Sequence, residues 1–266
     1  MPLLVTSASG VNSNGGHLGA FSNDARIDDP RGLAVDQENE LLFLNSGSDR
    51  VLALDRDGKV VRDTGLIPQL NPGGGNFGPD GRYYVGMRSA RTIMAFSATL
   101  DEAGQRFLPP GIVPFPRGFA FGADGVLYLS SGIGPNAEGD NTVVAFARGQ
   151  TLKPSRLVCD PALSPLDLAV APNGNIVVSS EHPFGGADAV ASVREYDIAD
   201  GQLVRVFSAR GSAQFRGPRG LRFGPDGTLY CVARDVVVAF DFTSGRCLCA
   251  VVRCPRLNGQ AVAFFP

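Results

Sequence analysis

A chain of 266 residues can form one or two domains and buries enough apolar surface to fold without disulfide bonds. Its formal net charge of −2 excludes a general electrostatic attraction to nucleic acid or to an anionic membrane, so neither partner is expected. Glycine (34 residues) and proline (19 residues) are more frequent than usual, which favours many short strands joined by tight turns.

The five cysteines leave one thiol over in any disulfide pairing, and none of their spacings fits a zinc site. No stretch reaches the ~20 apolar residues of a membrane-spanning helix, and the first ten residues lack the basic start of a secretion signal. We therefore expect a soluble, cytoplasmic protein that holds no cofactor or metal ion. We also expect it to act as a monomer.

Five segments align without gaps, and each consists of a short apolar run, a turn and a second apolar run. Their first residues, in chain order, are Pro30, Pro72, Pro116, Pro165 and Pro218. Four of the turns read Gly-Pro-Asp-Gly, Gly-Ala-Asp-Gly or Ala-Pro-Asn-Gly, in which the Asp/Asn-Gly pair supplies the positive φ of a reversing chain. Each segment is therefore predicted to be a β-hairpin of two strands, here called A and B.

A column of large apolar residues follows each hairpin and predicts a third strand, C. Its members are Leu54, Phe96, Phe146, Tyr196 and Phe240. A further turn and a fourth apolar run come next, as at Asp57-Gly58 before Val60-Val61, and predict strand D. Four antiparallel strands that recur every 39 to 53 residues are typical of the blades of a β-propeller.

The sixth copy is split between the two ends of the chain. The last residues, LNGQAVAFFP, match strand A, and the first, MPLLVTSASG, match strand B, with Gly19-Ala20-Phe21 in the strand C column. The sequence thus predicts an all-β, six-bladed β-propeller, one domain over residues 1–266, with four-stranded antiparallel blades. Blade six would comprise about 257–266 plus 1–29, so that both terminal strands close the ring and protect its edges. A β-sandwich or barrel is the alternative. It is disfavoured because the hairpin segments and the strand C residues independently repeat in the same six-fold register.

The hairpin consensus Pro-Arg-Gly-Leu-Ala-Val-Asp, followed by Arg-Val-Leu-Ala-Leu-Asp-Arg-Asp-Gly at 50–58, resembles NHL-repeat propellers. The resemblance covers all six copies and implies the propeller fold. It does not imply one function, because NHL proteins include RNA-binding and protein-binding modules as well as lyases.

The chain is also distantly similar to calcium-dependent lactonases of the SMP-30/gluconolactonase type. Their Glu, Asn and Asp metal ligands lie mostly at or near the position before the strand A glycine. Here that column reads Arg31, Gly73, Arg117, Leu166, Arg219 and Asn258. Only Asn258 fits, and three guanidinium groups would repel a calcium ion, so we expect no metal. A divergent metal-dependent lactonase that uses Asp167, Glu181, Asn258 and His182 is kept as an alternative.

Streptogramin lyases look similar in their Gly-Pro-Asp-Gly hairpins. Members of that family act through histidines and a glutamate. This chain has only two histidines, His17 and His182, so the match is partial.

The B–C and D–A connections are expected on one face of the ring, here called the loop face. They include the longest insertions, at 131–141 and 181–190. Variable loops on a rigid repeat are where binding sites are usually built.

Charged residues collect at the same face. We predict that six of them and one amide bind the ligand: Arg31, Arg117 and Arg219 before strand A, Arg88 and Arg234 after strand B, Asp167 in place of a repeat glycine, and the amide Asn258. Guanidinium forks match carboxylates and phosphates, and the walls of a channel focus their field. Alternatively, each arginine is structural and pairs with an acid or a carbonyl of a neighbouring blade.

These features predict a propeller that binds an anionic or polar small molecule at the loop face. The sequence leaves open whether it is an enzyme. If it is, we expect a lyase or hydrolase in which His182 or Glu181 moves a proton and the arginines stabilise negative charge. The other reading is a non-catalytic NHL-type module that binds a peptide or RNA.

Overall fold

The computed structural model describes residues 3–7, 20–134, 140–181, 191–207, 217–254 and 257–265. In this part of the chain every regular element is a β-strand. No helix of the described residues is long and apolar enough to cross a membrane.

The fold is an all-β propeller, in which the described residues form five four-stranded antiparallel sheets. Blade 1 contains β2 (Gly32–Asp36), β3 (Leu41–Ser46), β4 (Arg50–Leu54) and β5 (Val60–Asp63). Blade 2 contains β6 (Pro72–Phe77), β7 (Tyr83–Met87), β8 (Thr92–Phe96) and β9 (Gln105–Arg106). Blade 3 contains β10 (Pro116–Phe121), β11 (Leu127–Ser131), β12 (Thr142–Phe146) and β13 (Ser155–Val158). Blade 4 contains β14 (Pro165–Val170), β15 (Ile176–Ser180), β16 (Ser192–Tyr196) and β17 (Leu203–Phe207). Blade 5 contains β18 (Pro218–Phe223), β19 (Leu229–Ala233), β20 (Val236–Phe240) and β21 (Cys247–Arg253).

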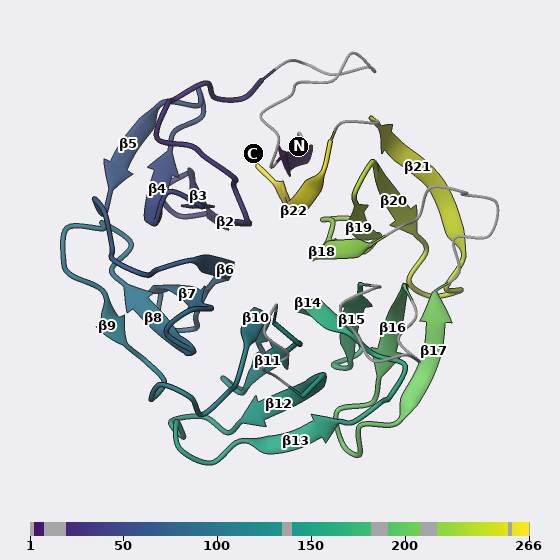
Figure 1. The fold of residues 1–266 in the computed structure, drawn as a ribbon. Helices are drawn as coiled ribbons and strands as arrows, with labels where there is room; N and C mark the ends of the chain where they lie inside the picture. The colour runs from purple at the N-terminus through teal and green to yellow at the C-terminus, as the bar shows by residue number, and fades with distance from the viewer. Residues whose placement is uncertain are drawn as a thin grey trace.

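Within each of these blades, chain order equals spatial order, so the first strand is innermost and the fourth lies at the rim (Figure 1). The predicted A–B hairpins are confirmed. In blades 2 to 5 the turn closes with a backbone hydrogen bond from its last residue to its first, as from Gly125 N to Gly122 O at 2.9 Å. Gly125 has a φ of 80°, a conformation that a residue with a Cβ adopts only at a cost.

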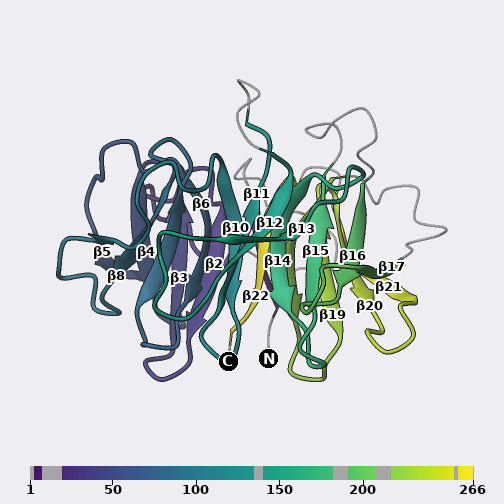
Figure 2. The ribbon, with the colours of Figure 1, turned by 90° about the horizontal axis from the view of Figure 1, so that it is seen from below.

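The two ends of the chain pair with each other. Strand β1 (Leu3–Ser7) runs antiparallel to β22 (Gly259–Phe264), with Leu3 opposite Phe264. β22 lies beside β18 on one side and β2 on the other, as Figure 1 shows. Figure 2 shows both chain ends at one face of the ring, and this is the face opposite the loop face.

The described residues therefore hold five four-stranded blades and one two-stranded sheet, where the sequence predicts six four-stranded blades. Residues 8–19, which belong to the predicted sixth blade, lie outside the described residues. Ala20 and Phe21, expected in strand C, lie in irregular structure. The ring of Phe21 packs edge-on against Phe265 at 5.8 Å, and this contact holds the segment against the chain end instead of in a sheet.

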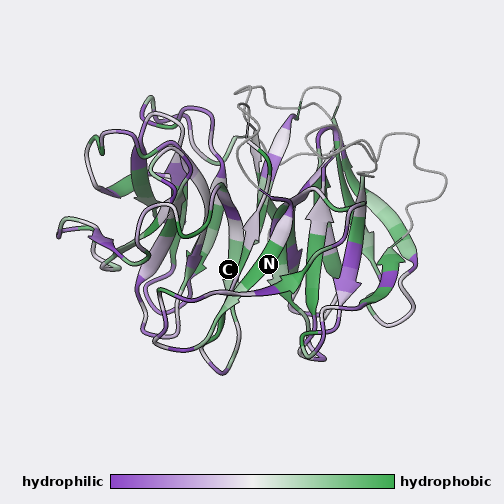
Figure 3. Ribbon diagram, turned by 60° about the horizontal axis from the view of Figure 1, so that its bottom comes forward, coloured by the Kyte–Doolittle hydropathy of each residue, from purple (hydrophilic) through white to green (hydrophobic). Residues whose placement is uncertain are grey.

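The core consists of apolar layers between successive sheets. Phe43 of blade 1 packs on Tyr83 of blade 2 at 4.8 Å, and Phe207 of blade 4 packs on Phe240 of blade 5 at 5.6 Å. The five strand C residues of blades 1 to 5 are buried, and none is more than 1% exposed, whereas Phe21 of the predicted sixth copy is half-buried. In Figure 3 the apolar colour follows the strands, whereas the turns are mostly polar. The inter-blade layers therefore stabilise the ring mainly by hydrophobic burial.

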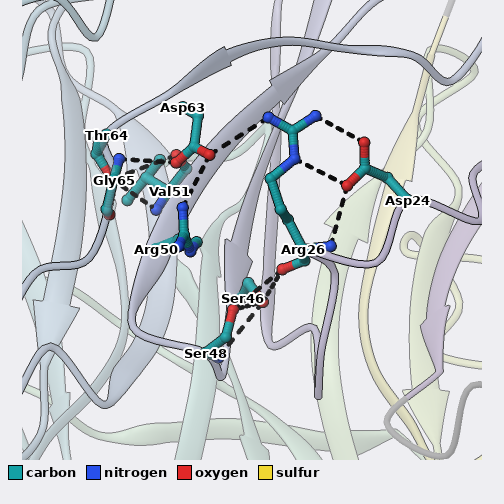
Figure 4. A network of polar contacts seen from close by, with 9 residues as sticks. All are labelled: Asp24, Arg26, Ser46, Ser48, Arg50, Val51, Asp63, Thr64 and Gly65. Atoms are coloured by element: carbon teal, nitrogen blue, oxygen red, sulfur yellow. Dashed lines mark hydrogen bonds and ion pairs between the residues drawn. The ribbon is translucent and has the colours of Figure 1, made fainter.

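A polar network attaches the segment before β2 to blade 1 (Figure 4). Arg26 donates to both carboxylate oxygens of Asp24, at 2.8 and 2.7 Å, and to Asp63 at 3.4 Å. Arg50 also bonds Asp63, at 3.0 Å, and Ser46 donates to the Arg26 carbonyl at 2.9 Å. The hydrogen bonds from Arg26 lower the pKa of Asp24 to about 2.

Candidate functional site

A cavity of about 290 Å³ opens on the propeller axis at the ends where the innermost strands begin. Its charged lining, among the described residues, consists of five arginines and three carboxylates: Arg31, Arg88, Arg117, Arg219, Arg222, Asp29, Asp167 and Glu181. Glycines at the strand starts make room for these side chains. A Cβ at Gly118, for example, would lie 2.2 Å from a carboxylate oxygen of Asp167.

One group of polar side chains, here called the Asn71 cluster, comprises Asp29, Arg31, Asn71 and Arg88 and joins blades 1 and 2. The Asn71 Oδ1 atom accepts from Arg31 Nη1 at 2.6 Å and from Arg88 Nη2 at 2.8 Å. Arg31 also forms an ion pair with Asp29, with Nη2 2.6 Å from Oδ2. Both guanidiniums thus find acceptors inside the protein, as the structural reading of the sequence predicts.

A second group, the Glu181 cluster, comprises Arg117, Glu181, Arg219 and Arg234 of blades 3 to 5. Arg219 Nε and Nη2 both donate to Glu181 Oε1, at 3.0 and 2.9 Å. Arg234 Nη2 lies 3.9 Å from the same oxygen. Glu181 is only 2% exposed, whereas the Arg234 side chain is 48% exposed, so the cluster runs from the interior to the surface. Arg234, a predicted ligand-binding residue, is not among the residues that line the cavity.

Arg117 completes this cluster from blade 3. Its guanidinium lies over the Phe115 ring, 5.2 Å from the centroid, and Nη2 donates to the Ile133 carbonyl at 2.8 Å. Gly132 permits this position, because a Cβ there would lie 2.2 Å from Arg117 Nε. Burial lowers the pKa of Arg117, the nearby charge of Arg219 lowers it further, and Glu181 opposes both effects.

The floor of the cavity is Arg222, a residue that the sequence analysis missed. Arg222 Nη1 lies 3.4 Å from Asp167 Oδ2, and Nη2 donates to the Leu33 and Gly75 carbonyls of blades 1 and 2 at 3.0 and 3.4 Å. Arg222 also lines a second cavity, of about 310 Å³, toward the opposite face, so it separates the two. The sequence did carry a signal, since the corresponding residues of the other repeats are small: Ala34, Asn76, Ala120, Ala169 and Ala261.

Asp167 takes the place of a repeat glycine in blade 4, and its side chain bonds the innermost strand of blade 5. Its Oδ2 accepts the Leu221 backbone N–H at 3.0 Å, an edge group of an innermost strand. Burial raises the pKa of Asp167, and the neighbouring Arg222 opposes that shift.

Asn258 and His182 are the remaining predicted site residues. Asn258 does not line the cavity, and its positive φ of 42° places it in the turn before β22. His182 and His17 lie outside the described residues. Within the described ranges, no three His, Cys, Asp or Glu side chains gather as a metal site would require. Of the alternative metal set, Asp167 and Glu181 line the cavity, whereas Asn258 is not among its lining residues.

The positive charge of the cavity is partly compensated by acids of the protein itself. Three arginines of the cavity form ion pairs: Arg31 with Asp29, Arg219 with Glu181, and Arg222 with Asp167. Five guanidiniums against three carboxylates still leave two positive charges in excess among the described lining residues. The cavity is therefore electropositive but internally paired.

Fold and site together define a propeller with a charged cavity on its axis. No family model matches the chain, and no curated protein matches it, so the NHL resemblance stays a prediction. Solved structures do match. A gluconolactonase from Xanthomonas campestris is 17% identical over 96% of this chain and 85% of its own, with a TM-score of 0.70.

Two further structures are similar. A virginiamycin B lyase from Staphylococcus aureus is 14% identical over 98% of this chain and 77% of its own, with a TM-score of 0.62. A propeller in a nidogen/laminin complex is 13% identical over 88% of this chain and 84% of its own, with a TM-score of 0.70. Because these identities are low, the likeness shows the propeller fold alone.

Proposed function

We propose that the chain binds a small anionic or strongly polar compound in the axial cavity. The observation that carries the proposal is the excess of guanidinium groups over carboxylates in the lining of one cavity, five against three among the described residues. Low-dielectric walls focus such an excess on the ligand, and guanidiniums donate in the geometry that carboxylates and phosphates accept.

We further propose lyase or hydrolase chemistry at this cavity. Such a reaction needs a group that moves a proton, and Glu181 supplies a carboxylate inside the lining. His182, the next residue, is the second candidate and lies outside the described residues. Arg117 and Arg219 would stabilise negative charge that develops on the substrate. The similar lyase and gluconolactonase structures support this only as examples of reactions found on the fold.

We also propose that the ring has six blades, with β1 and β22 as the inner part of the sixth. Two observations support this: β22 lies between β18 and β2, and the described residues contain six apolar clusters, one for each junction of such a ring. Deletion of residues 3–7 should then lower the melting temperature strongly, because β22 loses its paired strand. Unchanged thermal unfolding would contradict the proposal.

The test of binding is thermal unfolding in the presence of separate anions: inorganic phosphate, sulfate, citrate and benzoate. A ligand that binds only the folded state raises the melting temperature by mass action. We expect at least one of these anions at millimolar concentration to do so, and a charge-reduced cavity, Arg117→Met, to weaken the effect. If none stabilises the protein, and mass spectrometry of the denatured protein detects no released compound, the proposal is wrong.

A further inference from the structure

Arg219 differs from the other arginines of the cavity in how its nitrogen atoms are used. The residue is 9% exposed, and two of its three nitrogens donate to Glu181 Oε1. The third, Nη1, is buried and has no hydrogen-bond partner among the described residues. A buried guanidinium nitrogen therefore carries two N–H donors without an acceptor.

A charged donor left without an acceptor is costly in a protein interior. The chain supplies an acceptor to every other nitrogen of Arg219, and the residue is one of those that line the cavity. Because water does not reach Nη1 in this arrangement, an acceptor oxygen brought by a bound compound would satisfy it after a small rotation of the guanidinium toward the cavity. The unpaired nitrogen thus marks one point of the cavity at which a ligand oxygen is stabilised.

The charges around Nη1 favour one negative charge on that ligand. The inner part of the Glu181 cluster contains two guanidiniums, Arg117 and Arg219, and one carboxylate, Glu181. One positive charge is therefore left over beside Nη1. Arg117 and Arg219 also act on each other unfavourably, since the charge of Arg219 helps lower the pKa of Arg117. A single anion between them relieves that repulsion.

The lining next to this cluster is apolar. Phe115, Ile133 and Leu166, all from blades 3 and 4, contribute to the same cavity as Arg219. A volume of about 290 Å³ is at the lower end of the range of ligand pockets, ~300–1,000 Å³, which favours a small ligand. A compact hydrocarbon or aromatic group would bury its surface there, whereas a densely charged phosphate would lose hydration without enough donors.

We propose that the cavity holds a subsite for a small organic monocarboxylate whose carboxylate accepts a hydrogen bond from Arg219 Nη1. The apolar body of the compound then lies against Phe115, Ile133 and Leu166. This inference rests on the proposed function, because it names the class of anion that the axial cavity binds. It assigns Glu181 a positioning role as well, since Glu181 holds the other edge of the Arg219 guanidinium.

Benzoate and benzamide are the probes, because they have the same shape and only benzoate carries a charge. Calorimetric titration should detect binding of benzoate to the full chain and at least about tenfold weaker binding of benzamide, the loss expected for a charge-assisted hydrogen bond. Inorganic phosphate is the third probe. Equal affinities for benzoate and benzamide would overturn the subsite.

Arg219→Lys tests the role of Nη1 itself. Lysine keeps a positive charge beside Glu181 but has no second nitrogen, so benzoate affinity should fall at least about tenfold while folding is retained. Arg205→Lys is the matched control, because Arg205 also pairs with a buried glutamate, Glu195, at 2.5 Å, but lies on β17 at the rim. That variant should keep benzoate affinity within about twofold.

The outcomes separate the two proposals. If phosphate, sulfate or citrate binds and benzoate does not, the monocarboxylate subsite is wrong while anion binding in the cavity stands. If none of the four anions binds and no released compound is detected, both proposals are wrong. Unchanged benzoate affinity in Arg219→Lys would show that Nη1 does not bind the carboxylate, and the subsite would be wrong. Should that variant fail to fold, the double variant Arg219→Gln, Glu181→Gln removes both charges together, and it must show the same loss for the subsite to stand.

Discussion

Two clusters of arginines face the same cavity and differ in how completely the protein satisfies them. In the Asn71 cluster, a single amide oxygen accepts from both Arg31 and Arg88, and Asp29 neutralises one charge. In the Glu181 cluster, Arg219 keeps a buried nitrogen for which the described residues supply no acceptor. Arg31 and Arg219 hold the same repeat position, the residue before the strand A glycine, and each bonds a neighbouring blade. Only Arg219 keeps a nitrogen without an acceptor among the described residues.

The difference teaches that an arginine in a repeat motif is not by itself evidence of a binding site. Arg31 and Arg219 have the same sequence context, Pro-Arg-Gly-Leu. What separates them is the neighbouring blade, which presents Asn71 to Arg31 and a single oxygen of Glu181 to Arg219. Substitutions in matched pairs across the two clusters test this difference.

The largest effect is expected from removal of a carboxylate charge in each cluster. Glu181→Gln leaves the Arg219 charge buried beside a neutral amide, and should lower the free energy of unfolding by about 3 kcal/mol. Asp29→Asn should cost less than about 1 kcal/mol, since the Asp29 side chain is 33% exposed. Urea unfolding measures both values. Equal losses would show that the two clusters are energetically alike.

Arg222 lies beneath both clusters and should affect stability almost as strongly. Arg222→Met leaves Asp167 buried without its guanidinium and removes donors from two carbonyls, so we expect a loss of about 2–3 kcal/mol in urea unfolding. The same variant should connect the two axial cavities, which a crystal structure would show. Stability equal to the wild type would mean that Arg222 does not bind the blades together.

A smaller effect is expected from the glycines that make room for the arginines. Gly132→Ala places a Cβ 2.2 Å from Arg117 Nε and must displace that side chain, so benzoate affinity should fall about three- to tenfold. Gly73→Ala is the counterpart beside the Asn71 cluster, where the new Cβ would lie 3.2 Å from the Arg117 carbonyl oxygen and 3.5 Å from Arg88 Cγ, so neither arginine side chain must move far. Its benzoate affinity should change less than about twofold. A larger loss of benzoate affinity in Gly73→Ala than in Gly132→Ala would place the ligand beside the Asn71 cluster and contradict the subsite.

The smallest effect is a pH dependence from Asp167. Its folded-state pKa is raised above 3.8 by burial, so the folded state binds the proton more tightly than the unfolded chain does. The stability that this proton contributes is present below about pH 3.8 and is lost as pH rises through the folded-state pKa. As pH rises from 4 to 7, the melting temperature of the wild type should therefore fall relative to that of Asp167→Asn. A difference independent of pH would contradict the shift.

Much of the fold was predictable, because it depends on local chemistry that repeats. The turn glycines, the strand C column and the pairing of the two chain ends follow from residue type and spacing, and the structure contains all three. The strand C prediction at Ala20 and Phe21 failed. Packing of Phe21 against Phe265 decided its position, and that contact joins residues far apart in the chain.

The candidate site was predictable only as a set of residues at one face. Repeat position alone placed Arg31, Arg88, Arg117, Arg219, Asp167 and Glu181 near the axis, and all six line the cavity. Repeat position could not show that Asn258 lies outside it. It also did not reveal Arg222, whose side chain reaches across the axis to carbonyls of two other blades.

The sequence by itself determined that the chain forms antiparallel blades around an axis, since turn chemistry and apolar periodicity act between near neighbours. Only the tertiary structure decided which arginines are satisfied by the protein and which keep a free donor. That property depends on distances of about 3 Å between side chains of different blades, and no local pattern in the chain encodes such distances.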